Sequence, residues 1–165
     1  MAHQNVFLLL GGNIGDRENF LRMAREQLAN KAGSIKKASA IYQTAAWGVE
    51  DQQPYLNQVL QIETKFTAEE LIAITQHIET TLGRTRQTRW EARVIDIDIL
   101  FFDNQIITKP GIEIPHPRLH LRRFTLIPLA EIAPDFKHPA LQKTVTDLLE
   151  ICPDELEVKK LHSPM

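Results

Sequence analysis

The sequence predicts a mixed α/β (α+β) fold, in which an antiparallel sheet carries two helices on one of its faces. The main observation is the order of the elements, because short apolar segments and amphipathic segments follow one another as β-α-β-β-α-β. The chain has 165 residues, near the commonest size of one domain, and it shows no linker, repeat or low-complexity segment. Prolines at positions 110, 115, 117 and 128 then break the chain into short pieces. We therefore expect one domain, residues 1–165, with a Pro-rich and partly helical C-terminal extension.

The first three elements lie within residues 5–44. Asn5–Leu10 is apolar and is followed by Gly11-Gly12-Asn13, a pattern that predicts a buried strand ending in a tight turn. Asp16 is a candidate N-cap for a helix from Arg17 to about Lys31. Ser34–Thr44 is predicted as a single strand, although its apolar residues alternate imperfectly.

The next three elements are the strand Leu56–Thr64, the helix 68–82 and the strand Val94–Phe102. Thr67 and Glu70 have the spacing of a capping box at the start of the helix, and Gly83 is expected at its C′ position. Helical fragments are expected at Arg122–Ile132 and Thr144–Ile151. The order of the six elements is that of a ferredoxin-like sandwich, a fold that by itself indicates no chemistry.

Composition excludes several classes of protein. Nineteen Lys and Arg residues against twenty-one Asp and Glu residues give a formal net charge of −2, which argues against a generally basic nucleic-acid-binding protein. The single Cys152 allows neither an internal disulfide nor a zinc site built from cysteines. The early apolar run Val6–Leu10 is too short for a signal sequence or a membrane span. We expect a soluble cytoplasmic protein that binds neither nucleic acid nor membrane.

Two aspartates occur within the most strand-like segment. The strand period of two places Asp96 and Asp98 on one face, about 6.6 Å apart along the chain, while the isoleucines between them point to the core. Such a pair can hold a hard divalent cation. Strand geometry alone favours the simpler interpretation of a solvated outer face, but aspartate is depleted in strands and two of them need a reason.

Arginines surround this pair in the sequence and supply that reason. Seven of the ten arginines lie between positions 84 and 123: Arg84, Arg86, Arg89, Arg93, Arg118, Arg122 and Arg123. The planar guanidinium forks of arginine match phosphate oxygens. Together with the two aspartates they predict a site for a polyphosphate and magnesium. A solvated surface and an RNA-binding surface are the alternatives, and the acidic residues in the same region weaken the second.

Other motifs are less specific. The segment 11–16 follows a strand and precedes a helix, but it lacks the Lys-Ser/Thr pair of a phosphate-binding loop, so a structural glycine turn is the better interpretation. His116 and His120 are four residues apart, but the prolines beside His116 exclude a regular helix and argue against a zinc pair. His116 is equally compatible with a phosphate contact and with loop packing.

Two polar segments without periodicity, Ala45–Pro54 and Arg84–Arg93, are predicted as loops. Each carries one tryptophan, Trp47 and Trp90 respectively. Stacking on a flat heterocycle and covering the edge of the core are equally compatible with these residues.

The run Arg89–Leu100 (RWEARVIDIDIL) closely resembles the signature of the 6-hydroxymethyl-7,8-dihydropterin pyrophosphokinases (2-amino-4-hydroxy-6-hydroxymethyldihydropteridine diphosphokinases). The resemblance spans roughly residues 5–135 and includes GGNIGD (11–16), YLN (55–57), QHIE (76–79), GRTR (83–86), PHPR (115–118), RRF (122–124) and PLAEIAP (128–134). Glu91-Ala92 stands where the family usually has Gly-Pro, and Ala45-Ala46-Trp47 where many members have prolines and leucine. Neither departure removes a residue with an assigned catalytic role.

The resemblance implies an enzyme with a ferredoxin-like fold that transfers pyrophosphate from ATP to the pterin hydroxymethyl group and releases AMP. It implies that Asp96 and Asp98 hold Mg²⁺, and that Arg84 and Arg93 neutralise charge on the transferred group. The ATP-site residues that it implies are Gln76, Glu79, Arg86, Trp90, Arg93, Ile99, His116 and Arg122. The pterin-site residues that it implies are Thr44, Ala45, Trp47, Tyr55, Asn57 and Phe124.

The expected partners are thus ATP and the pterin, with the protein acting as a monomer. A non-catalytic module of the same fold that senses a nucleotide or RNA is the alternative, and it would have no need of both Asp96 and Asp98.

Overall fold

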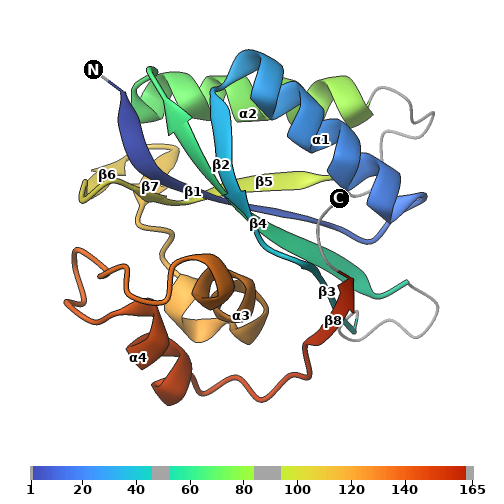
Figure 1. The fold of residues 1–165 in the computed structure, drawn as a ribbon. Coiled ribbons are helices and arrows are strands. Elements are labelled where there is room, and N and C mark those ends of the chain that lie inside the picture. The colour runs from blue at the N-terminus through green and yellow to red at the C-terminus, as the bar shows by residue number, and fades with distance from the viewer. Residues whose placement is uncertain (1, 46–52, 84–93, 163–165) are drawn as a thin grey trace.

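The computed structural model describes residues 2–45, 53–83 and 94–162, in which an antiparallel sheet is covered by helices on both faces (Figure 1). The strands are β1 (His3–Gly12), β2 (Ser34–Ala38), β3 (Ile41–Thr44), β4 (Tyr55–Thr64), β5 (Asp96–Phe102), β6 (Ile107–Lys109), β7 (Ile112–Ile114) and β8 (Lys159–His162). The helices are α1 (Arg17–Lys31), α2 (Ala68–Gly83), α3 (Arg123–Ile132) and α4 (Val145–Ile151), with a short 3-10 turn η1 (Leu119–Leu121). Within these residues, no helix is both long and apolar enough to cross a bilayer.

The sheet has the order β5-β1-β4-β3-β8, and β2 pairs with the other half of β4. Strand β1 lies between β5 and β4, and its side chains alternate between two cores. Val6, Leu8 and Leu10 belong to the core beneath α1 and α2, whereas Phe7 and Leu9 belong to the core beneath α3 and α4. This second layer, seen below the sheet in Figure 1, explains why the run is apolar throughout rather than alternating.

The helix starts agree with the capping residues that the sequence predicts. The Asp16 side chain accepts a hydrogen bond from the Asn19 N–H, and α1 begins at Arg17. Thr67 and Glu70 form the reciprocal bonds of a capping box at the start of α2. The prediction for Gly83 is wrong: this glycine is the last residue of α2 rather than the residue after it.

The predicted strand Ser34–Thr44 is in fact two strands, β2 and β3. Between them the buried Ser39 donates its N–H to the Val59 carbonyl at 2.8 Å, and its hydroxyl accepts the Val59 N–H at 2.9 Å. A side-chain oxygen thus takes the place of a backbone carbonyl in the ladder, and the chain shifts its register on β4 at this point.

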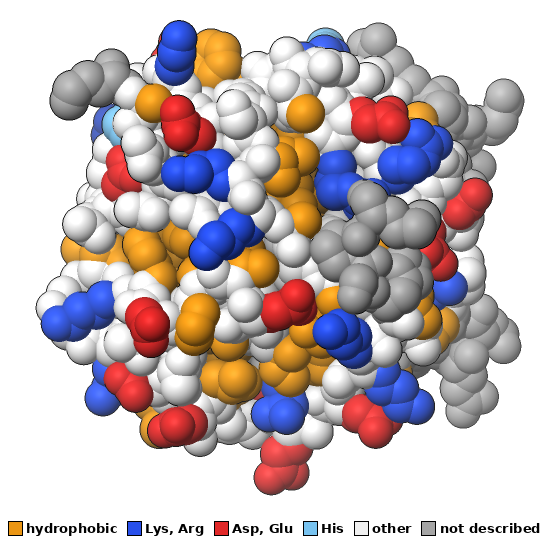
Figure 2. Space-filling view, in the orientation of Figure 1, with side chains coloured by type: hydrophobic (Ala, Val, Ile, Leu, Met, Phe, Trp, Pro, Cys, Tyr) orange, Lys and Arg blue, Asp and Glu red, His pale blue; other side chains and the backbone are white. Residues whose placement is uncertain are grey.

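The Pro-rich part contains elements that the sequence did not predict. Strands β6 and β7 form a two-stranded hairpin, and β8 pairs with β3 at the edge of the main sheet. The helix at Val145 has the capping box Thr144/Asp147, in agreement with the predicted fragment. On the face that Figure 2 shows, positive and negative side chains are interspersed among apolar ones, without an extended patch of one sign.

His138 is a buried histidine in the core beneath α3 and α4. Its Nδ1 atom accepts the N–H groups of Ala140 and Leu141 at 3.1 and 3.0 Å, and its ring packs edge-on against Phe101. Burial lowers the pKa of His138 below its ordinary value of 6.5, and the neighbouring His120 acts in the same direction.

The buried His138 predicts a loss of stability in acid. The pKa of His138 is lower in the folded protein than in the unfolded chain. Between that lowered pKa and 6.5 the unfolded chain therefore binds more protons than the folded protein. Because of this difference, the free energy of unfolding falls as the pH drops below about 6.5. We expect His138→Asn, which keeps an acceptor near the Nδ1 position, to flatten this dependence. Urea unfolding at pH 7.5, 6.5 and 5.5 measures it. Equal pH slopes for the variant and the parent would contradict the assignment.

Candidate active site

Asp96 and Asp98 lie on β5 and share one face of the sheet, as the sequence predicted. In the register of β1 and β5, Asp96 is opposite Gly11 and Asp98 is opposite Leu9, a residue of the core beneath α3. The intervening Ile97 belongs to the core on the opposite face. Both aspartates are half-buried, so their carboxylates are on the side of α3 and remain accessible.

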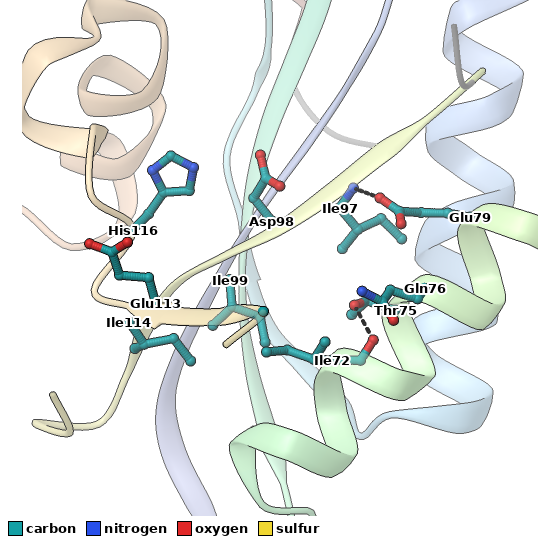
Figure 3. Close-up of a pocket in the computed structure, with 11 residues that line it drawn as sticks. Ile72, Thr75, Gln76, Glu79, Ile97, Asp98, Ile99, Glu113, Ile114 and His116 are labelled. Carbon is teal, nitrogen blue, oxygen red and sulfur yellow. Dashed lines mark hydrogen bonds between the residues drawn. The ribbon is translucent and has the colours of Figure 1, made fainter. Parts of the chain in front are cut away.

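A cavity of about 220 Å³, called here the edge cavity, follows the outer edge of β5 between α2 and β7 (Figure 3). Among the described residues β5 is the last strand of the sheet, and no described strand of the sheet pairs with this edge. The described residues that line it include four that the resemblance assigns to ATP, namely Gln76, Glu79, Ile99 and His116. Asp98, Ile72, Thr75, Ile97, Gly111, Glu113 and Ile114 complete the lining.

Glu79 joins α2 to the edge strand. Its side chain is 6% exposed, and its Oε2 atom accepts the Ile97 N–H at 2.7 Å, as the dashed line in Figure 3 shows. The carboxylate therefore satisfies a backbone donor on the strand edge that a neighbouring strand would otherwise bind. This contact ties α2 to β5 next to Asp98, in addition to the pairing of β5 with β1.

His116 lies across the edge cavity from α2, and Figure 3 shows its ring on the side of Asp98 away from Glu79. Its Nδ1 atom accepts the Arg118 N–H at 3.1 Å, so a neutral ring carries its proton on Nε2. Burial lowers the pKa of His116 below its ordinary value. The negative charge of Asp98 raises this pKa and the positive charge of Arg122 lowers it, and the net effect is a lowered pKa. A neutral His116 near pH 7 offers an N–H donor at Nε2.

A second cavity of about 370 Å³, called here the sheet cavity, lies on the α3 side of the sheet. It is lined by Leu9, Gly11, Ala45, Tyr55, Asn57, Asp96, Asp98, Arg122, Phe124 and Leu156. Its size is at the lower end of the range for small-molecule sites. The lining combines apolar side chains with a few polar groups, an arrangement that suits a small heterocyclic ligand.

Gly11 forms the floor of the sheet cavity. It is in register with Asp96 on one side and with Asn57 on the other. Because glycine has no side chain, a hollow remains between these two polar residues. A Cβ atom at this position would lie 2.8 Å from the Asn57 Oδ1 atom.

Asn57 is oriented from behind by Thr44. The Asn57 side chain is 4% exposed, and its Nδ2 atom donates to the Thr44 hydroxyl at 3.3 Å. This bond leaves the carbonyl oxygen of Asn57 directed towards Gly11. Thr44, which the resemblance assigns to the pterin, does not itself line the cavity and supports Asn57 instead.

The structure places Arg122 in the sheet cavity, among the residues that the resemblance assigns to the pterin rather than to ATP. Its guanidinium carbon is 5.6 Å from the centre of the Phe124 ring, a distance at which a cation and an aromatic face attract each other. Asp98 lines both cavities, so the two sites meet at this carboxylate.

The metal-binding potential of the aspartate pair fits one class of cation. Among the described residues, no group of three or more His, Cys, Asp or Glu side chains could enclose a metal. Mg²⁺ is commonly held by one or two carboxylates together with substrate phosphates and water. Asp96 and Asp98, half-buried on one face, provide the hard oxygen ligands of such a site.

Several predicted site residues lie outside the described residues: Trp47, Arg84, Arg86, Trp90 and Arg93. The described residues Gln53 and Pro54, which follow the segment with Trp47, are held by hydrogen bonds. Arg17 donates to the Pro54 carbonyl at 2.8 Å, and the Gln53 side chain donates to the Gly15 carbonyl at 3.2 Å. The turn after β1 thus holds the chain immediately before β4.

Three residues of the sheet cavity were missed in the sequence, namely Leu9, Gly11 and Leu156. Leu9 is indistinguishable from its apolar neighbours, and Gly11 was assigned only to the turn. The strand register could have identified Gly11, because an antiparallel pairing that sets Asp96 opposite it also reveals the missing side chain.

The chain is similar to known proteins in sequence and in fold. The family model of 7,8-dihydro-6-hydroxymethylpterin-pyrophosphokinase (HPPK) matches residues 7–134. The chain is 45% identical over 128 residues to 2-amino-4-hydroxy-6-hydroxymethyldihydropteridine pyrophosphokinase of Bacillus subtilis, with 77% of each chain covered. It is 37% identical over 142 residues to the enzyme of that name from Aquifex aeolicus, with 86% of this chain and 88% of the relative covered.

A solved structure of similar fold is Plasmodium falciparum HPPK-DHPS, crystallised with pteroate, at a TM-score of 0.72 and 17% identity. The match covers 91% of this chain but only 42% of that one, so the present chain spans less than half of it. At this identity the likeness concerns the fold alone. The sequence relatives and the family model carry the assignment: the chain belongs to the 7,8-dihydro-6-hydroxymethylpterin-pyrophosphokinase family.

Proposed function

We propose that the two cavities divide the two substrates of a pyrophosphoryl transfer between them. The reaction is the transfer of pyrophosphate from ATP to the hydroxymethyl group of 6-hydroxymethyl-7,8-dihydropterin, a step of folate biosynthesis. The observation that carries the proposal is the position of Asp98 in the lining of both cavities. ATP occupies the edge cavity with its phosphates towards Asp98, and the pterin occupies the sheet cavity.

The chemistry requires this meeting point. The hydroxymethyl oxygen attacks the β-phosphorus of ATP and forms a new O–P bond. The bond from that phosphorus to the bridging α,β-oxygen breaks, AMP departs with the oxygen, and the proton of the hydroxyl group is released to solvent. Most of the rate enhancement in such a transfer comes from positioning and from stabilisation of charge, so the hydroxymethyl group and the β-phosphate must lie at the same carboxylate pair.

The sheet cavity has the chemistry that a pterin needs. A pterin has flat apolar faces and an edge of donors and acceptors. The half-exposed Tyr55 and the Phe124 ring provide apolar surfaces for its faces, and the oriented amide of Asn57 provides directional hydrogen bonds for its edge.

Asp96 and Asp98 would hold Mg²⁺ at the junction of the cavities. The bound ion would neutralise negative charge on the ATP phosphates. The protein's own residues bind and orient the substrates: His116 donates from Nε2 to a phosphate oxygen, and Arg122 contributes positive charge from the sheet cavity. Arg84, Arg86, Trp90 and Arg93 complete the nucleotide site, with Arg84 and Arg93 in the catalytic role that the family resemblance gives them.

We also infer that the sheet with α1 and α2 is a ferredoxin-like sandwich. The strand order β5-β1-β4 followed by β2 and β3, with both helices on one face, supports this assignment. The layer with α3 and α4 is then an extension that covers the other face. We also propose that the protein functions as a monomer in the cytoplasm.

An assay of AMP formation tests the proposed function. We expect the purified protein, with ATP, Mg²⁺ and 6-hydroxymethyl-7,8-dihydropterin, to produce AMP and the pterin diphosphate in equal amounts. AMP should not accumulate when the pterin is omitted. A protein that binds ATP without producing AMP in the complete mixture would support the alternative of a nucleotide-sensing module.

A further inference from the structure

The segment after α4 follows the surface of the domain in an alternating pattern. Cys152, Asp154, Leu156 and Val158 are half-buried, whereas the three residues between them are exposed. The segment then becomes β8, which pairs with β3, and Figure 1 shows it rising from α4 to that edge of the sheet. All of it lies beyond residue 134, where the match to the family model ends.

Asp154 attaches this segment to the first turn of α3. Its Oδ2 atom accepts the Arg123 N–H at 3.0 Å, and its Oδ1 atom accepts the Leu156 N–H at 2.9 Å. The N-cap residue of α3, Arg122, forms no side-chain capping bond. A carboxylate from 31 residues further along the chain therefore caps the helix, and its negative charge is favourable at a helix N-terminus.

The capped turn carries two residues of the sheet cavity, Arg122 and Phe124. Leu156, two residues after Asp154, lines the same cavity directly. The C-terminal segment thus reaches the cavity in two ways, through a side chain in its lining and through the helix turn that carries part of the remaining lining.

We propose that residues 153–158 form one wall of the pterin site, in which Leu156 contacts the bound heterocycle and Asp154 positions both Leu156 and the first turn of α3. This proposal rests on the proposed function and assigns a specificity-determining role to a segment that the family match does not include. The C-terminal segment also covers the edge of β3, but that role belongs to β8. Leu156 precedes β8, so edge pairing does not explain why Leu156 lines the sheet cavity.

The test compares two leucines of the same segment. Leu156→Ala removes the side chain from the cavity, and Leu161→Ala removes the same atoms from β8, where Leu161 is 40% exposed. Calorimetric titration measures the Kd of 6-hydroxymethylpterin at saturating Mg²⁺ and α,β-methylene-ATP, whose α,β-bridge cannot be cleaved. The Kd of this nucleotide is measured separately without pterin.

We expect Leu156→Ala to raise the Kd of the pterin about tenfold, the effect of losing an aliphatic contact in a ligand pocket. The Kd of the nucleotide should stay within twofold, and Leu161→Ala should match the parent protein in both. If the parent binds both ligands and Leu156→Ala binds the pterin equally well, residues 153–158 do not form a wall of the pterin site, and the proposed function stands. A parent protein that binds no pterin at all would overturn the proposed function as well.

Asp154 is tested by a conservative rescue. Asp154→Ala removes both acceptors, whereas Asp154→Asn keeps one. We expect the alanine variant to raise the KM for the dihydropterin while kcat changes less than twofold, and the asparagine variant to restore most of the KM. A purely structural role would lower the active fraction and therefore kcat, without changing KM, and that result would overturn the positioning role.

Discussion

Replacing Asp98 by alanine is expected to lower turnover by about 10³-fold, the upper range for loss of a preorganised electrostatic partner in an active site. Asp98 lines both cavities, so its removal affects the site where the β-phosphate and the hydroxymethyl group meet. Asp96→Ala should have a comparable effect, because a carboxylate pair loses half of its oxygen ligands when either member is removed.

The same substitutions should leave the fold intact. Both residues are half-buried, and their side chains lie on the cavity side of β5 while Ile97 points to the core, so we expect a loss of unfolding free energy of about 1 kcal/mol or less. The measurement is the initial rate of AMP formation at saturating ATP, pterin and Mg²⁺, together with thermal unfolding of each variant.

Asp103 provides the control for these variants. It follows β5 directly and bonds the His3 ring at 2.7 Å, and it lines neither cavity. Asp103→Asn should retain nearly full activity, and asparagine tolerates its positive φ of 51°. Near-parental turnover of Asp96→Ala or Asp98→Ala, with Mg²⁺ as the only divalent cation, would refute the metal assignment.

Much of the fold could be predicted because periodicity and capping are local signals. The strand at Leu56, the capping box at Thr67 and the alternation around Asp96 all reflect interactions within a few residues. The division of Ser34–Thr44 could not be predicted, because it depends on the Ser39 hydroxyl reaching Val59 on another strand. The hairpin of β6 and β7 consists of three-residue strands, too short for a periodic pattern.

Some residues of the candidate site could be predicted from local sequence patterns, and others could not. The aspartate pair needs only the strand period, whereas the division into two cavities needs the sheet order. Arg122 illustrates the limit: the sequence places it among candidate phosphate ligands, and only the geometry of α3 shows its guanidinium over Phe124 in the sheet cavity. Leu156 carries no local signal, because a tertiary contact through Asp154 brings it to the site.

Gly11→Ala and Gly12→Ala should have different effects, although the two glycines are adjacent: the first should lower activity and the second should lower stability. A Cβ atom at Gly12 would lie 2.4 Å from the Val94 carbonyl oxygen, a backbone atom that cannot rotate away. The approach is enforced by the buried Val94 and Ile95, which lead into β5. We expect Gly12→Ala to destabilise the protein by about 2–3 kcal/mol, as overpacking of a core does.

A Cβ atom at Gly11 would instead meet the Asn57 side chain, at 2.8 Å from its Oδ1 atom. The methyl group would fill the floor of the sheet cavity between Asp96 and Asn57 and would displace the amide that Thr44 orients. We therefore expect Gly11→Ala to lower kcat/KM for the dihydropterin about 10²-fold, the effect of misplacing a reactant by about 1 Å. Nucleotide affinity should be nearly unchanged, because Gly11 does not line the edge cavity.

Urea unfolding and steady-state kinetics on both variants separate the two effects. Gly11→Ala should lose activity while its urea midpoint stays close to that of the parent. Gly12→Ala should unfold at a lower urea concentration, and its folded fraction should keep the parental KM for the pterin. If Gly11→Ala kept the parental kcat/KM, the hollow between Asp96 and Asn57 would not be where the pterin binds. A methyl group and a bound pterin cannot occupy the same space at the floor of the sheet cavity. Parental kinetics would therefore mean that this cavity binds a ligand other than the pterin.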